Sequence, residues 1–187
     1  MMSAELQKWH FNVDQYYRLA EVGVLNPDDR VELIEGEIIR MSPIGTRHAS
    51  SVAKLLHGLT KMETLAATFW VQNPVRLDTF SEPVPDVALL KPRHDFYAER
   101  HPTSEDVLLI IEIADTTVLT DRNVKVPLYA RFRIPEVWRV NLPKKLVEVY
   151  SDPTDGPYRK QSNFQIGDTI TSPTIPGLTL KVDDIIA

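Results

Sequence analysis

Apolar residues recur along the chain at two spacings, one typical of helices and one typical of strands. The helical spacing predicts three helices: residues 12–23, 46–66 and 121–132. Asn12 and Gln15 have the pattern of a capping box at the start of the first helix. Pro127 lies inside the third, so this helix should begin late or bend at the proline.

Shorter apolar runs bounded by turn residues predict the strands. They are residues 69–77, 84–90, 107–113, 136–141 and 146–150, together with a hairpin at residues 30–41. The polar residues 91–106 contain two prolines and should form a long loop. The run at 107–113 is the most apolar in the chain, and its continuity predicts a central strand that is covered on both faces.

The order of these elements predicts an α/β fold, in which helices flank a mixed sheet and an additional β region follows residue 150. No repeat or linker interrupts the 187 residues, so we expect one domain over residues 1–187. Cysteine is absent, which excludes disulfides and thiolate metal sites and agrees with a cytoplasmic protein. Neither a signal peptide nor a membrane-spanning segment is predicted.

Charge is distributed unevenly along the chain. The net charge of −5 argues against strong nonspecific binding to nucleic acid. Residues 122–145, however, contain seven basic residues and one acidic residue, and this segment could face phosphate groups. The alternative is that the segment forms a solvated helix and hairpin, and the sequence leaves both interpretations open.

Glu112 and Asp86 are two carboxylates that occur in apolar strands. Glu112 interrupts the run at 107–113, where an ionised carboxylate is costly unless a cation or hydrogen bonds compensate it. Asp86 follows Pro85 at the start of another strand. With the backbone carbonyl of Ile113, the two carboxylates would suit Mg²⁺, which prefers oxygen ligands. The alternatives are a Glu112 paired with an arginine at a sheet edge and an Asp86 that merely forms a turn.

Lys125 is the candidate cation of such a site. It lies thirteen residues after Glu112 and four after Asp121, on the third predicted helix. In the catalytic interpretation Lys125 reaches the metal site, where it orients the attacking water and stabilises negative charge. In the simpler interpretation Lys125 and Asp121 form a surface ion pair worth about 0.3–0.5 kcal/mol.

Several short motifs occur in a defined order and spacing. They are Pro85-Asp86, Ile111-Glu112-Ile113-Ala114-Asp115, Asp121 with Lys125 and Tyr129, Met41-Ser42-Pro43 with His48, and residues 31–37, 134–138 and 175–178. Together these motifs resemble the Uma-two family, a bacterial group classed as endonucleases within the PD-(D/E)XK superfamily. The resemblance extends over about residues 12–185 and implies a restriction-endonuclease-like core, a mixed sheet between helices.

The resemblance also implies four catalytic residues and two supporting ones: Glu32, Asp86, Glu112 and Lys125, with His48 and Asp121. Asp86 and Glu112 match the metal carboxylates, and Glu32 resembles an acidic residue that precedes the core strands. The superfamily usually has a lysine two residues after the glutamate, but this position is Ala114. Lys125 matches a lysine that has moved to the following helix.

The function that the resemblance implies is hydrolysis of phosphodiester bonds, in DNA rather than RNA. Mg²⁺ would be the cofactor, Mn²⁺ a substitute, and a homodimer would reach both strands. Two other classes remain. One is a module whose degenerate site only binds nucleic acid or a protein, which Ala114 and the net charge favour. The other is a metal-free glycoside hydrolase, although only 8% of the residues are aromatic and could line a sugar cleft.

Overall fold

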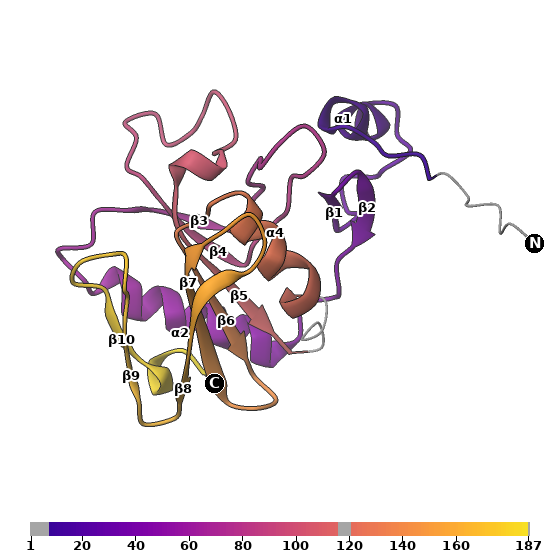
Figure 1. Cartoon of the computed structure of the whole chain (residues 1–187). Coiled ribbons are helices and arrows are strands. Elements are labelled where there is room, and N and C mark those ends of the chain that lie inside the picture. Colours follow the sequence, from indigo (N-terminus) through magenta and orange to yellow (C-terminus); the bar gives the residue numbers. More distant parts are fainter. Residues whose placement is uncertain (1–7, 116–120, 187) are drawn as a thin grey trace, which may run out of the picture.

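Six strands form the main sheet of the computed structural model, which describes residues 8–115 and 121–186 (Figure 1). In spatial order they are β3 (Thr68–Val71), β4 (Val87–Leu90), β5 (Val107–Ala114), β6 (Glu136–Asn141), β7 (Leu146–Pro153) and β8 (Tyr158–Gln165). Strands β5 and β6 are parallel, and the other neighbouring pairs are antiparallel. The predicted mixed α/β fold is therefore confirmed.

Different segments cover the two faces of this sheet (Figure 1). The covering elements are α2 (Thr46–Thr60), β9 (Thr169–Thr171), β10 (Thr179–Lys181) and the turn Val182–Asp184 on one face, and α4 (Val126–Arg131) on the other. Successive residues of a strand point to opposite faces. Ile111 of β5 accordingly packs under α2, and Ile110 packs under α4. The prediction that residues 107–113 form a central strand covered on both faces is confirmed.

Local sequence signals set where two of the helices begin. Helix α1 (Val13–Glu21) follows Asn12, whose side chain accepts a hydrogen bond from the Gln15 N–H at 2.8 Å in the predicted capping box. Residues Asp121–Lys125 form a π-helical turn before α4, and Pro127 falls in the first turn of α4, where its missing N–H removes no helical bond. The predicted late start is confirmed. Over the two described ranges, no helix is long and apolar enough to cross a membrane.

Three predicted elements are longer than the observed ones. The helix predicted to reach residue 66 ends at Thr60, and the strands predicted at 69–77 and 84–90 shorten to β3 and β4. Pro74 follows β3 and Pro85 precedes β4, and proline cannot donate a hydrogen bond to a neighbouring strand. The apolar pattern therefore continues past the point where strand pairing stops.

A separate hairpin, β1 (Val31–Ile34) and β2 (Glu37–Arg40), lies beside the sheet (Figure 1). Its two-residue turn has positive φ at both positions, 51° at Glu35 and 80° at Gly36, as a type I′ turn requires. A Cβ atom added at Gly36 would lie 2.5 Å from the Cβ of His10, so this close approach also requires glycine. The predicted hairpin is confirmed, and the segment that precedes α1 packs against its turn.

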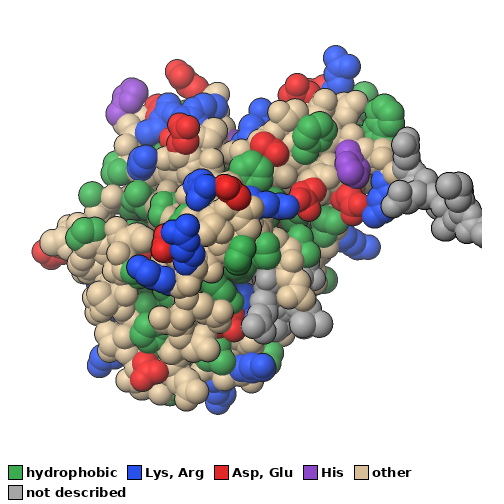
Figure 2. All heavy atoms as spheres, viewed as in Figure 1, with side chains coloured by type: hydrophobic (Ala, Val, Ile, Leu, Met, Phe, Trp, Pro, Cys, Tyr) green, Lys and Arg blue, Asp and Glu red, His purple; other side chains and the backbone are tan. Residues whose placement is uncertain are grey.

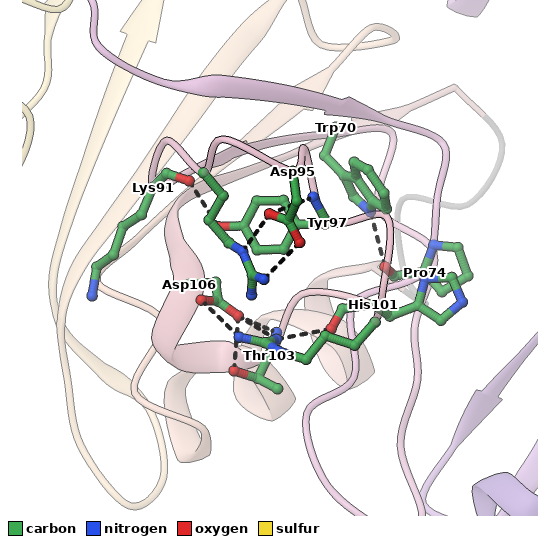
Figure 3. A network of polar contacts seen from close by, with 10 residues as sticks. Trp70, Pro74, Lys91, Asp95, Tyr97, His101, Thr103 and Asp106 are labelled. Atoms are coloured by element: carbon green, nitrogen blue, oxygen red, sulfur yellow. Dashed lines mark hydrogen bonds and ion pairs between the residues drawn. The ribbon is translucent and has the colours of Figure 1, made fainter.

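The predicted loop at residues 91–106 is held together by a polar network (Figure 3). The Tyr97 hydroxyl donates to the backbone carbonyl of Lys91 at 2.7 Å, and Arg100 pairs with Asp106 at 2.8 Å. The polar composition predicted a loop. It did not predict these hydrogen bonds and ion pairs, because they depend on which polar groups come into contact after folding.

Candidate active site

Asp86 and Glu112 lie opposite each other where strands β4 and β5 adjoin. Val87 pairs with Ile111 in the antiparallel register, and one further step places Asp86 opposite Glu112. Side chains that are opposite in such a pair project from the same face. Asp86 Oδ2 accepts a hydrogen bond from the Ile113 N–H at 2.8 Å, which fixes this carboxylate beside Glu112. The structure thus brings together the two residues predicted as metal carboxylates.

The ammonium group of Lys125 lies between two buried carboxylates. Its Nζ atom is 3.0 Å from Glu32 Oε2 and 3.3 Å from Glu112 Oε1, and the Lys125 side chain is only 6% exposed. The interpretation of Lys125 as a surface residue is therefore wrong, and the side chain of Asp121 lies outside the described part of the chain. Glu32 is oriented by the Val84 N–H, which donates to Glu32 Oε2 at 3.0 Å.

Tyr129 belongs to the site, although its sequence motif did not predict a role for it. Its hydroxyl donates to Glu112 Oε1 at 2.6 Å, and the residue is fully buried. Lys125 and Tyr129 are four residues apart, so they project from the same side of a helical segment, and both reach Glu112. The four-residue spacing of Lys125 and Tyr129 was therefore the sequence signal that could have predicted a role for Tyr129.

We expect Tyr129→Phe to lower the free energy of unfolding by about 1–3 kcal/mol, because a buried carboxylate would lose one hydrogen bond. Urea unfolding followed by circular dichroism measures this change. Tyr16→Phe is the matched control, since the Tyr16 hydroxyl donates at 3.2 Å to a neutral acceptor, the carbonyl of Val31. Equal losses in the two variants would mean that the Tyr129 hydroxyl gives Glu112 no special support.

His48 contacts Asp86 from the first turn of α2. Its Nε2 atom is 2.9 Å from Asp86 Oδ1. This hydrogen bond raises the pKa of His48, and burial of the ring opposes the shift. The Nδ1 atom is buried and has no hydrogen-bond partner among the described residues. His48 is therefore bonded to the site and holds one oxygen of Asp86 in place.

Six of the predicted residues line one cavity of about 240 Å³: Glu32, His48, Asp86, Glu112, Ile113 and Lys125. Its charged and polar lining includes three basic residues, four acidic residues and one histidine: Arg30, Arg40, Lys125, Glu32, Asp86, Glu112, Asp115 and His48. No Phe, Tyr or Trp of the described residues lines the cavity, so it lacks the aromatic walls expected of a sugar cleft.

Oxygen atoms in this cavity suit a hard divalent cation. Asp86 and Glu112 offer carboxylates, Ile113 offers its backbone carbonyl, and Mg²⁺ usually keeps several water ligands. Among the described residues, no three His, Asp or Glu side chains form a metal cluster, and the predicted set is smaller than such a cluster. The chemistry of the donors therefore fits Mg²⁺, while the coordination itself stays a prediction.

Residues 122–145 do not form a continuous basic surface. Arg139 is buried in the sheet, which removes it from contact with any external phosphate, and the buried Lys125 lines the cavity instead of the outer surface. Three arginines of the segment, Arg131, Arg133 and Arg139, pair with the acidic residues Glu35, Asp155 and Glu148. On the face shown in Figure 2, basic and acidic side chains are interspersed rather than gathered in one patch.

Comparison with known proteins gives one family match and a similar solved structure. Residues 13–183 match the Uma2 family, described as "Putative restriction endonuclease". A similar solved structure is that of "a putative nuclease belonging to DUF820" from Anabaena variabilis. The two chains share 16% sequence identity, the match covers 94% of this chain and 97% of the other, and the TM-score is 0.69. The search of curated proteins gave no match. Because the family match covers most of the sequence, this chain belongs to the Uma2 family.

Proposed function

We propose that the protein is a metal-dependent endonuclease that hydrolyses phosphodiester bonds in DNA. The observation that carries this proposal is the buried Lys125 ammonium, which contacts Glu32 and Glu112 in the cavity that also contains Asp86. A lysine next to metal-type carboxylates can stabilise the negative charge that develops on a phosphate during hydrolysis. Lys125 thus supplies the group that Ala114 cannot provide.

The cation would be held by Asp86, Glu112 and the carbonyl of Ile113. When bound, Mg²⁺ or Mn²⁺ polarises a phosphoryl oxygen and lowers the pKa of a bound water molecule. The other steps of the proposed hydrolysis depend on this chain's own side chains and on the contacts described above.

Each protein group has a distinct part in the proposed reaction. Lys125 Nζ donates hydrogen bonds that orient the attacking water and stabilise the charged phosphate, and Glu32 keeps this ammonium in place. Tyr129 fixes one oxygen of Glu112, and His48 fixes one oxygen of Asp86. Water attacks phosphorus and releases one proton to solvent, one P–O ester bond breaks, and the leaving oxygen takes a proton from solvent.

The proposal predicts cleavage that depends on a divalent cation. Purified protein should nick supercoiled plasmid DNA in millimolar Mg²⁺ or Mn²⁺, and EDTA should stop the reaction. Asp86→Asn and Glu112→Gln should each reduce the nicking rate about a hundredfold or more, because each removes a negative charge that would hold the cation. Glu99→Gln is the matched control, since Glu99 is an exposed carboxylate that does not line the cavity.

Two results would contradict this function. Equal nicking by the wild-type protein and both site variants would mean that another enzyme cuts the plasmid. DNA binding without cleavage in either cation would favour the alternative class, a nuclease fold whose degenerate site only binds its partner.

A further inference from the structure

A second and larger cavity, of about 860 Å³, lies next to the cavity that contains Asp86, Glu112 and Lys125, which we call the catalytic cavity. Its apolar walls come from the hairpin, the segment after β3, and the helical segment that carries Lys125: Ile34, Ile39, Phe80, Val124 and Phe132. The proposed reaction uses none of these side chains. The volume is within the range of small-molecule pockets, roughly 300–1,000 Å³.

The two cavities adjoin along one face of the hairpin. Glu32 lines the catalytic cavity and Ile34 lines the second one, and residues two apart on a strand share a face about 6.6 Å apart. Ile39, which pairs with Glu32 across the hairpin, lines both cavities. On the helical side, Lys125 lines the first and the neighbouring Val124 lines the second. One nucleotide could therefore reach from one cavity to the other.

The two cavities differ in the number of basic side chains that line them, while both contain carboxylates. The catalytic cavity contains basic groups from Arg30, Arg40 and Lys125, which would attract a phosphate. The second cavity contains three carboxylates and one arginine: Glu35, Glu37, Asp78 and Arg131. Arg131 is paired with Glu35, so this cavity offers no unpaired arginine to a phosphate. Glu35 is thereby bonded to Arg131 and Glu37 is bonded to Lys8, while a carboxylate such as that of Asp78 can accept hydrogen bonds from the amino groups of bases.

Aromatic rings complete a lining that suits a nucleobase. Phe80 and Phe132 both line the cavity, and the Phe80 side chain is unusually open, with 44% of the residue exposed. Bases stack on such rings whatever their sequence, because every base has a π-face. A flat, uncharged group with hydrogen-bonding edges therefore fits this cavity, and a second phosphate does not.

We propose that the second cavity binds one unpaired nucleobase of the strand whose phosphate enters the catalytic cavity. This inference rests on the proposed function and makes it more specific. A base inside a duplex must leave its stack to enter, whereas a single-stranded or mismatched base avoids that cost. The substrate class that follows is DNA with unpaired nucleotides near the cleaved bond.

The test uses base binding in the absence of cleavage. The probe is a six-nucleotide single strand of thymidines with one 2-aminopurine, titrated with the full-length protein in EDTA while fluorescence is recorded. The wild-type protein should quench the 2-aminopurine signal, and Phe80→Ala should weaken binding about tenfold, the loss typical of one base–aromatic contact. Phe80→Trp keeps an aromatic surface and should retain binding. Phe96→Ala is the matched control, because Phe96 is 69% exposed and lines neither cavity.

The outcomes separate this inference from the proposed function. Quenching that is equal in the wild-type protein and Phe80→Ala overturns the base site, even if plasmid DNA is cut. Quenching that depends on Phe80, without metal-dependent cleavage, supports the base site and overturns the nuclease proposal alone. A wild-type dimer that Phe80→Ala converts to a monomer, measured by sedimentation, would assign the cavity to a second copy of the chain and also overturn the base site.

Discussion

Lys125→Met is expected to abolish DNA cleavage and to lower the free energy of unfolding by about 3–5 kcal/mol. The substitution keeps a long side chain but removes the ammonium group between Glu32 and Glu112, whose side chains are 5% and 3% exposed. Two buried carboxylates would then face each other without the cation that now contacts both. Urea unfolding measures the stability, and plasmid nicking in Mg²⁺ measures the activity.

The effect of divalent cations on thermal stability gives a second test of the role of Lys125. Mg²⁺ or Mn²⁺ should raise the melting temperature of Lys125→Met more than that of the wild-type protein, because the variant lacks its own positive charge at the site. Lys144→Met is the control, since Lys144 is exposed at the turn between β6 and β7 and should leave both stability and nicking unchanged. A Lys125→Met protein that is as stable and as active as the wild type would contradict the role given to this ammonium.

The sequence predicted the elements of this site better than their contacts. Alternation along a strand puts Glu112 on the face of Ile110, and the structure agrees, because Ile110 packs in one cluster with Tyr129, whose hydroxyl donates to Glu112. The contact between Lys125 and Glu32 could not be read in this way. It requires the hairpin to lie against the helical segment, and that packing joins residues 93 positions apart in the sequence.

The roles of Tyr129 and His48 show the same limit. Tyr129 was noted as part of a motif, but its hydrogen bond to Glu112 depends on how α4 packs on the sheet. His48 was predicted as a supporting residue from the resemblance alone, and only the fold brings its Nε2 atom to Asp86. A pattern gives the type of residue and the face of an element, whereas a hydrogen bond also needs the orientation of two elements.

Charge counting failed for a related reason. Residues 122–145 are rich in basic residues, yet a count of charges does not say which of them face solvent. Arg139 illustrates this, because it lies in β6 between Glu112 of β5 and Glu148 of β7 in the strand register. It is 1% exposed and pairs with Glu148, whose Oε2 atom also accepts from the Tyr150 hydroxyl at 2.9 Å.

Arg139→Met is accordingly expected to destabilise the protein by about 3–5 kcal/mol, although the same change at a phosphate-binding surface would cost little. Its removal leaves the Glu148 carboxylate buried without its cation, and breaking a buried ion pair from one side is strongly unfavourable. Urea unfolding of Arg139→Met gives the value. Arg133→Met is the matched control, because its partner Asp155 is 92% exposed, so its loss should cost less than about 1 kcal/mol.

The double variant Arg139→Met/Glu148→Leu separates charge from shape. If the single variant suffers because a carboxylate is left uncompensated, removing that carboxylate as well should recover most of the lost stability, since apolar pairs often replace buried ion pairs at little cost. If the double variant is as unstable as the sum of both single variants, the two side chains act independently and their ion pair contributes nothing. Recovery would instead show that the ion pair with Glu148 stabilises the interior of the sheet, and that Arg139 contributes to the fold and not to phosphate binding.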